Sequence, residues 1–320
     1  MLTYVFRRLL ISVLLLAIIS VISFMIFKMT PGASSYWFLL NPKISQAAKQ
    51  NYIRKFHLDQ PLHRQYWIMM TDLFRGRLVS NKDERPVIEK ISERLPATLR
   101  LNAVSLLIEF AFGISWGVYA AMNRGKWVDR AGSIAAFILI TVPSFWLAYL
   151  LCIFLVKVVG VPILGIESFG YVYSNSLATF FDRLWHLMFP ASILAIGGIA
   201  VLSRYVRAST LEVLAEDYIR TGRAKGLDEA TVFYKHALRN SLRPVITMIG
   251  FLLPALIGGS VIIESIFAYP GIGRLGFEAV TERDYPVLVT LNLVAAALVL
   301  VGNLIADILY AVVDPRVRLD

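Results

Sequence analysis

The stretch Asp217-Tyr-Ile-Arg-Thr-Gly-Arg-Ala-Lys-Gly-Leu227 lies inside a long basic loop, residues 203–244, that separates two apolar runs. Connecting loops in such chains are usually short, but this one has a helical period of its own. Apolar or small residues recur at the i, i+3, i+4, i+7 and i+8 spacing of one helical face, namely Leu211, Leu214, Ala215, Tyr218, Ile219 and Gly222. The pattern predicts an amphipathic helix outside the apolar runs.

A glycine and an aspartate predict where this helix ends and the next one begins. Gly226 is expected at C′, and Arg223 and Lys225 would lie close to the negative end of the helix dipole. Asp228 is expected to cap a following helix that bends near Pro244. The residues leave two interpretations open: a lever that docks into a partner protein, or a helix that lies on the lipid surface.

The composition indicates a membrane protein, because a mean hydropathy of +0.64 with 57% hydrophobic residues is too apolar for a soluble domain. A membrane-spanning helix needs roughly 20 mostly apolar residues. The chain supplies six such runs, at approximately 9–27, 97–122, 131–156, 184–202, 245–268 and 287–313. The fold class predicted is therefore all-α with six transmembrane helices, kinked or opened at Pro143, Pro190 and Pro254.

The distribution of basic residues predicts the orientation of these helices. With the N-terminus inside, fifteen Lys and Arg residues share its side, whereas the short loops on the other side hold four. Because cytoplasmic loops carry the excess of Lys and Arg, both termini are predicted to be cytoplasmic. The net charge of +10 then follows from topology and from contact with membrane lipid, so no nucleic acid partner is expected.

The chain is expected to consist of four parts. Residues 1–30 form an N-terminal helix, which is favoured over a cleaved signal peptide because its apolar stretch of about 19 residues exceeds a signal core. Residues 31–96 form an extracytoplasmic segment, with short amphipathic helices or a small packed cap. Residues 97–313 form a five-helix core that includes the basic loop, and residues 314–320 form a cytoplasmic tail. Gly113 and Gly117 indicate close helix packing.

Three acidic residues fall within the apolar runs, where each is costly unless it meets a partner or a cavity. Glu109 lies near the middle of the second run, where it could line a translocation pathway or act structurally between helices. Glu264 lies near the outer end of its run and is a second pathway candidate. Asp307 favours a structural pairing, and His186 and His236 favour packing roles. Cys152 is the only cysteine, so neither a disulfide nor a cysteine-based metal site is possible within the chain.

Residues 217–227 and 236–245 resemble the coupling-loop ("EAA") motif of ABC-importer permeases, and more narrowly the oligopeptide/dipeptide branch. Further stretches match that branch in order along the whole chain, at 7–10, 30–32, 58–62, 93–98, 143–148, 269–273, 283–287 and 303–316. Two departures stand out. Gly222 replaces a more usual Ala, which weakens a helix by about 1 kcal/mol. Ala33-Ser34 replaces an Asp-Pro pair.

The resemblance implies a type I ABC-importer permease fold in a bacterial or archaeal cytoplasmic (inner) membrane. It implies four kinds of partner: a second homologous permease, two cytoplasmic ABC ATPase subunits, an extracytoplasmic substrate-binding protein and membrane lipid. The chain itself would bind no cofactor, and ATP and Mg²⁺ would be held by the ATPase subunits. The sequence agrees, since Gly125-Lys126 is followed by Trp127 and no phosphate-binding loop is present.

The residues that the resemblance assigns to ATPase coupling are Leu211, Leu214, Ala215, Tyr218, Arg220, Thr221, Gly222, Arg223, Ala224, Lys225 and Gly226. No catalytic residue and no metal site are expected. The solute stays open among peptides, metal chelates, glutathione and sugars. Two other functions are alternatives: a secondary transporter that is proton-coupled through Glu109, and a membrane enzyme, which no HExxH motif or serine elbow supports.

Overall fold

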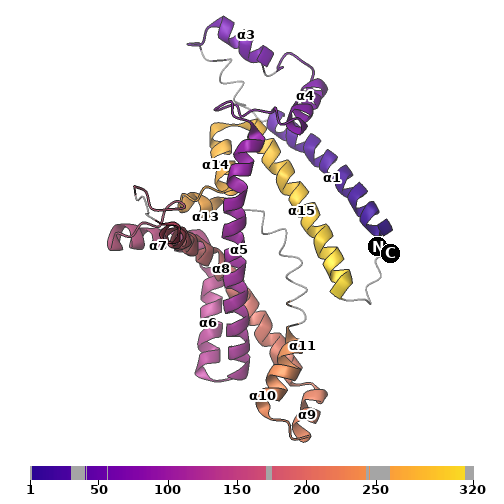
Figure 1. Ribbon diagram of the computed structural model, residues 1–320, viewed down its shortest axis with the longest axis vertical. Coiled ribbons are helices and arrows are strands. Elements are labelled where there is room, and N and C mark those ends of the chain that lie inside the picture. Colours follow the sequence, from indigo (N-terminus) through magenta and orange to yellow (C-terminus); the bar gives the residue numbers. More distant parts are fainter. Residues whose placement is uncertain are drawn as a thin grey trace. The chain divides into compact units, whose positions relative to one another are not determined.

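The computed structural model describes residues 2–29, 40, 42–55, 57–170, 175–242, 245 and 260–313. It is almost entirely helical (Figure 1), which confirms the all-α class. Among the described residues, β structure is limited to an isolated antiparallel bridge between Val79 and Pro86. The chain divides into two compact units: Met1–Ala97 with Gly271–Asp320, and Thr98–Pro270.

In the first unit, helices α1 (Leu2–Met29) and α15 (Tyr285–Val313) pack side by side (Figure 1). Asn292 Nδ2 donates a hydrogen bond to Ser23 Oγ at 2.5 Å, and the rings of Phe27 and Tyr285 lie 5.8 Å apart. Segments of both helices are long and apolar enough to cross a membrane, in agreement with the first and last predicted spans.

Two short helices lie in the segment at 31–96: α3 (Gln46–Lys55) and α4 (Leu62–Phe74). Helix α4 packs on α1 through Tyr66, whose hydroxyl lies 2.6 Å from Ser20 Oγ and whose ring contacts Phe24 edge to face. Trp67 and Phe74 are exposed, as an amphipathic helix at a membrane surface would have them.

Helix α5 (Val87–Met122) begins ten residues before the predicted second span and belongs to both units. Its first turns are amphipathic, and they bury Val87 and Ile91 against α14 (Ile272–Glu282) and the start of α15. The core of the first unit is made of Val87, Ile91, Leu275, Ala279, Val287 and Leu291. This packing explains the extension, since buried apolar contacts stabilise a helix beyond what its local sequence provides.

In the second unit, α5 packs against α8 (Ser176–Leu214) at the two glycines of the predicted close contact. A methyl group at Gly113 would lie 2.9 Å from Leu202 Cδ2, and one at Gly117 would lie 2.6 Å from the carbonyl oxygen of Ser203. Neither position has space for a side chain, so the predicted close packing is confirmed. Helix α6 (Trp127–Thr141) also packs on α8.

The predicted third span is broken into two helices. Helix α6 ends at Thr141, and α7 (Ser144–Cys152) with the π-helical η1 (Ile153–Val159) continues at 91° to it. Pro143 lies at the break, where it lacks a backbone N–H and disfavours helix at the preceding residue. By contrast, Pro190 lies inside the continuous helix α8.

The described residues contain four helices able to cross a membrane, or up to five if the bent pair is one span. The predicted fifth span, 245–268, falls largely outside the described residues, and Pro254 lies there too. Its final part is described as α13 (Val261–Ile266), which packs on α7 and α8.

Candidate functional site

The basic loop forms a helical elbow that continues directly from α8. Helix α8 ends at Leu214, Glu216 is extended, and α9 (Asp217–Ala224) then begins in a new direction. The single helical face predicted from Leu211 to Gly222 is therefore interrupted. The apolar spacing continues across this break, so the sequence pattern did not indicate it.

The predicted end of α9 is confirmed. Lys225 is the C-cap residue, and Gly226 has a φ of +78°, in the left-handed region that favours glycine. Asp228 accepts a hydrogen bond from the backbone of Thr231 at 2.9 Å and caps the next helix, as predicted. Hydrogen bonds from Thr231 lower the pKa of the Asp228 carboxyl from its usual value.

That next helix is built from α10 (Glu229–Thr231), the π-helical η2 (Val232–Leu238) and α11 (Arg239–Ser241). We call residues 217–241 the elbow. Its small core consists of Ile219, Val232 and Ala237, all buried, with Val213 and Leu214 of α8 packed against them. The predicted apolar face thus turns inward at Leu214 and Ile219, where it joins the elbow to the spanning helix.

Polar contacts reinforce this join. Ser209 Oγ of α8 donates to the carbonyl oxygen of Ser241 at 3.0 Å, and Asn240 Nδ2 donates to the Tyr218 hydroxyl at 3.0 Å. Arg223 binds both carboxylate oxygens of Glu229, at 2.8 and 3.2 Å, instead of remaining a free charge at the helix end. Sequence reasoning missed the partners in the second helix, because nothing in one sequence indicates which residues meet across Gly226.

The face of α9 opposite Ile219 is exposed, and we call it the docking face: Asp217, Arg220, Thr221 and Ala224. It is polar, with Arg220 paired to Asp217 at 3.3 Å. Of the other predicted coupling residues, Ala215, Tyr218, Arg223, Lys225 and Gly226 are exposed, and Leu211, Leu214 and Gly222 are half-buried. The structure therefore groups most of the predicted residues on one exposed element.

The two pathway candidates have different surroundings in the second unit. Glu264 is fully buried and accepts a hydrogen bond from Thr98 Oγ1 at 2.9 Å, so it links α13 to α5. Glu109 is half-buried on α5 against Gly198 of α8. Helix α6 is also joined to α8 by an ion pair, in which Arg207 of α8 binds both carboxylate oxygens of Asp129, in the first turn of α6, at 2.5 and 2.8 Å.

Two further titratable candidates, Asp307 and His186, lie in packed or paired positions within the protein. Asp307 accepts a hydrogen bond from the Tyr4 hydroxyl and pairs with Arg8, both at 3.0 Å, which confirms the predicted pairing. His186 is fully buried, as a packing role requires. No group of three His, Cys, Asp or Glu residues that could hold a metal occurs in the part of the chain that the structure describes.

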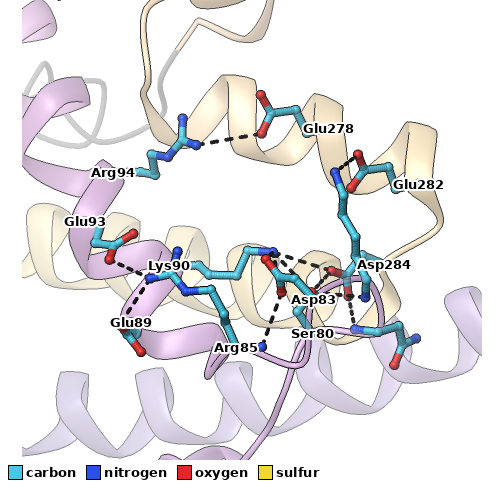
Figure 2. Close-up of polar contacts among 12 residues, drawn as sticks. Ser80, Asp83, Arg85, Glu89, Lys90, Glu93, Arg94, Glu278, Glu282 and Asp284 are labelled. Atoms are coloured by element: carbon cyan, nitrogen blue, oxygen red, sulfur yellow. Dashed lines mark hydrogen bonds and ion pairs between the residues drawn. The ribbon is translucent and has the colours of Figure 1, made fainter.

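A second polar site, which the sequence did not reveal, lies in the first unit (Figure 2). We call it the charged cluster: Ser80, Lys82, Asp83, Lys90, Glu282 and Asp284. Buried Asp284 accepts hydrogen bonds from Ser80 Oγ and, at 3.0 Å, from the backbone of Asn81. Lys90 pairs with Asp83 at 3.0 Å, and Lys82 pairs with Glu282. A cavity of about 160 Å³ adjoins these residues.

Hydrogen bonds in the charged cluster favour the ionised form of the Asp83 carboxyl group. Burial alone would raise the pKa of the Asp83 carboxyl, but hydrogen bonds from Lys90 and Ser80 outweigh it and hold that pKa below its usual value. Glu282 raises the pKa of the Lys82 ammonium group through a hydrogen bond. The cluster therefore ties the loop after α4 to the end of α14 through ion pairs and hydrogen bonds.

Comparison with known proteins assigns the family. Residues 113–319 match "Binding-protein-dependent transport system inner membrane component", and residues 1–102 match the N-terminal part of the same class of proteins. The chain belongs to this family. The permease is thus a multi-pass inner membrane component of an ABC importer, and its relatives are transport subunits, not enzymes.

The curated relatives extend over the full chain. The permease is 41% identical to the oligopeptide transport system permease protein AppB of Bacillus subtilis, over 99% of this chain and 100% of that protein. It is 35% identical to the dipeptide transport system permease protein DppB of Alkalihalophilus pseudofirmus, with the same coverage. It is also 36% identical to the glutathione transport system permease protein GsiC of an Escherichia coli O6:H1 strain, over 99% of both chains. The resemblance to the oligopeptide/dipeptide branch is confirmed.

A solved structure supports the fold. A chain of the MetNI methionine ABC transporter, in inward-facing conformations, superimposes with a TM-score of 0.53. The match covers 72% of the permease and 98% of that chain, at 20% identity. This likeness shows an importer-permease fold, and at that identity it shows nothing about the solute.

Proposed function

We propose that the chain is one of two permease subunits in an ATP-driven importer and forms half of its translocation pathway. A second homologous permease supplies the other half, and two cytoplasmic ATPase subunits hold ATP and Mg²⁺. An extracytoplasmic binding protein delivers the solute, which is a peptide or a related small solute. Both termini lie in the cytoplasm, and six spans are present, the fifth at 245–268. The oligopeptide, dipeptide and glutathione permeases among the relatives support a peptide-like solute.

The elbow is the observation that carries this proposal. Its docking face is exposed, whereas the opposite side of α9 is packed through Ile219 onto residues that also contact α8. A displacement applied to α9 by an ATPase subunit therefore passes through packed contacts into a spanning helix, as rigid-body switching requires. A helix that only rested on lipid would present apolar residues outward, whereas the docking face is polar.

The first test identifies the partners. The tagged chain is purified from its native membrane in mild detergent, and stoichiometric partners are identified by mass spectrometry. The proposal expects two ATPase subunits and a second multi-span permease. A chain that is recovered alone and that drives uptake from an ion gradient after reconstitution would overturn the proposal and favour a secondary transporter.

The second test addresses the docking face with a matched pair of charge reversals. Arg220 is exposed on the docking face, and Arg130 is exposed at the start of α6, on the same predicted side of the membrane. Since reversing a charge at an interface costs several kcal/mol, Arg220→Glu should lower uptake at least roughly tenfold without lowering the amount of inserted chain. Arg130→Glu should keep its uptake. Equal uptake by the two variants would contradict the assignment of the docking face.

A further inference from the structure

Helix α5 carries a polar stripe along one face of its spanning part. Thr98, Asn102, Ser105 and Glu109 follow one another at the i, i+4, i+7 and i+11 spacing that aligns residues on a helix. The first three are buried within the second unit. The stripe begins at Thr98, which is bonded to Glu264, and Glu109 is its last member. Beyond Glu109, Gly113 and Gly117 seal α5 against α8.

The Glu109 carboxyl group lies against a glycine of α8. A methyl group at Gly198 would overlap that carboxyl group, whereas a methyl group at the adjacent Gly197 would have nothing within 4 Å. No hydrogen bond or ion pair reaches Glu109 from the residues that the structure describes. A glycine therefore provides the space for this carboxyl group, and the described residues of the second unit provide no partner for it.

The apolar stretches of the helices around Glu109 carry no cationic side chain. The apolar stretches 101–122, 131–156, 187–203 and 245–263 contain no Lys, Arg or His. Arg100 precedes Glu109 by nine residues of α5, a rise of about 14 Å. An acidic side chain within a membrane span is costly unless it faces a partner or an aqueous cavity. These apolar stretches therefore supply no cationic partner for Glu109.

We propose that half-buried Glu109, which lies against Gly198, binds the positively charged ammonium group of the solute. This inference rests on the proposed function. An ammonium group has three donors and no acceptor, and a carboxylate has acceptors only, so the two form a charge-assisted hydrogen bond.

The test uses the complete importer with its co-purified partners, reconstituted in proteoliposomes with ATP inside. The probes are trialanine, which carries an ammonium group, and N-acetyl-trialanine, which does not. Glu109→Gln keeps the size of the side chain and removes its charge. Uptake of trialanine should fall about tenfold, the usual worth of a hydrogen bond to a charged group, and uptake of the acetylated peptide should stay within about twofold. Any preference of the binding protein for one of the two peptides is the same for the unaltered importer and for Glu109→Gln, so it cancels when their uptake is compared.

The two adjacent glycines provide a matched control that leaves Glu109 in place. Gly198→Ala displaces the carboxyl group and should reproduce the selective loss of trialanine uptake. Gly197→Ala has the same effect on helix propensity but meets open space, so it should transport both probes normally. If both alanine variants behave alike, the space at Gly198 has no role in binding.

The outcomes separate this inference from the proposed function. If the unaltered complex has no ATP-dependent uptake and no ATPase partners, the proposed function fails. If the unaltered complex transports and Glu109→Gln is unchanged, or loses both probes equally, the proposed function stands and the ammonium site is overturned. If the unaltered complex does not transport the acetylated peptide, the uptake comparison is replaced by a protection experiment, in which each peptide competes with the labelling of Glu109 by a hydrophobic carbodiimide. Trialanine should protect Glu109 at least about tenfold better than the acetylated peptide, and equal protection overturns the site.

Discussion

The elbow and the charged cluster each fasten separate helical segments together, but they do so with different chemistry. In the elbow, Ile219, Val232 and Ala237 form a buried apolar core, and the ion pairs around it are exposed. In the charged cluster, the central group is itself a carboxylate, Asp284, which is buried and hydrogen-bonded to Ser80. Apolar packing responds little to salt, whereas ion pairs at a surface are screened by it.

This difference suits the tasks that we assign to the two regions. An element that transmits motion must keep its shape while its exposed face is loaded, and a packed core does this without depending on salt. The charged cluster instead fixes the loop after α4 to α14, and its stability depends on exact pairing, because a buried charge that loses its partners is strongly destabilising. The comparison predicts unequal responses to matched substitutions.

The largest loss of stability is expected from a substitution at the centre of the charged cluster. Asp284→Ala would leave Ser80, the backbone of Asn81 and largely buried Lys90 without the carboxylate that they now share. We expect a loss of about 3–5 kcal/mol of stability in the first unit. Thermal unfolding of the detergent-solubilised complex measures it.

The exposed pair in the same cluster is the control. Lys82 and Glu282 have exposed fractions of 54% and 32%, so Glu282→Gln should cost at most about 1 kcal/mol. If Asp284→Ala and Glu282→Gln lower the unfolding temperature equally, burial does not decide the strength of this cluster, and the contrast with the elbow breaks down.

The next effect is expected in the core of the elbow. Ile219 is fully buried, so Ile219→Ala should cost about 2–5 kcal/mol, from lost burial and the cavity left behind. Because only a small region unfolds, hydrogen exchange at the amides of α9 and η2 is the appropriate measurement. Uptake should fall with it, since α9 would no longer be held against α8.

A surface substitution in the elbow tests whether the Arg223–Glu229 ion pair stabilises the elbow as much as buried Ile219 does. Arg223 and Glu229 are 43% and 72% exposed, so Arg223→Gln should cost no more than about 1 kcal/mol, and less at high salt. Faster exchange after Arg223→Gln than after Ile219→Ala would show that charge, not apolar packing, holds the elbow together.

The sequence predicted features of these regions that depend on neighbouring residues. The left-handed glycine at 226 and the N-cap at Asp228 were predicted because a chain terminates and starts helices by local rules. The close packing at Gly113 and Gly117 was predicted for a related reason, since small residues four apart place a smooth patch on one helix face. The helical class was predicted from the apolar runs, and the location of the candidate site from the amphipathic spacing of residues 211–222.

Contacts between distant residues were not predictable. The charged cluster joins Ser80 to Asp284 across 204 positions, and Thr98 meets Glu264 across 166. The pairing of such residues depends on how helices assemble, which a single sequence does not encode in any local pattern. The inward orientation of Ile219 was missed for the same reason: its partners Val232 and Ala237 lie beyond the turn at Gly226.

A smaller effect is expected where the elbow turns. Gly226 has a φ of +78° and open space around it, so a side chain there is opposed by backbone strain alone. Gly226→Val should cost about 1–2 kcal/mol, whereas Gly226→Asn should cost less, because Asn tolerates the left-handed region. Hydrogen exchange of α9 and ATP-dependent uptake should change in the same order. Equal effects of Val and Asn would show that the turn is not strained by a β-branched residue.

The smallest effect is expected on α9 itself, and it has the opposite sign. A methyl group at Gly222 would lie 3.6 Å from Leu227 Cδ1 and 3.9 Å from Val232 Cγ2, both ordinary van der Waals contacts. Gly222→Ala should therefore stabilise α9 by up to about 1 kcal/mol through helix propensity, with transport retained. Gly222→Leu is the control, because its longer side chain would meet Leu227 and lose that gain. Amide exchange in α9 should become slower in the Ala variant and not in the Leu variant, because only the small methyl group fits beside Leu227. Faster exchange in the Ala variant would contradict the prediction and show that α9 needs a glycine at position 222.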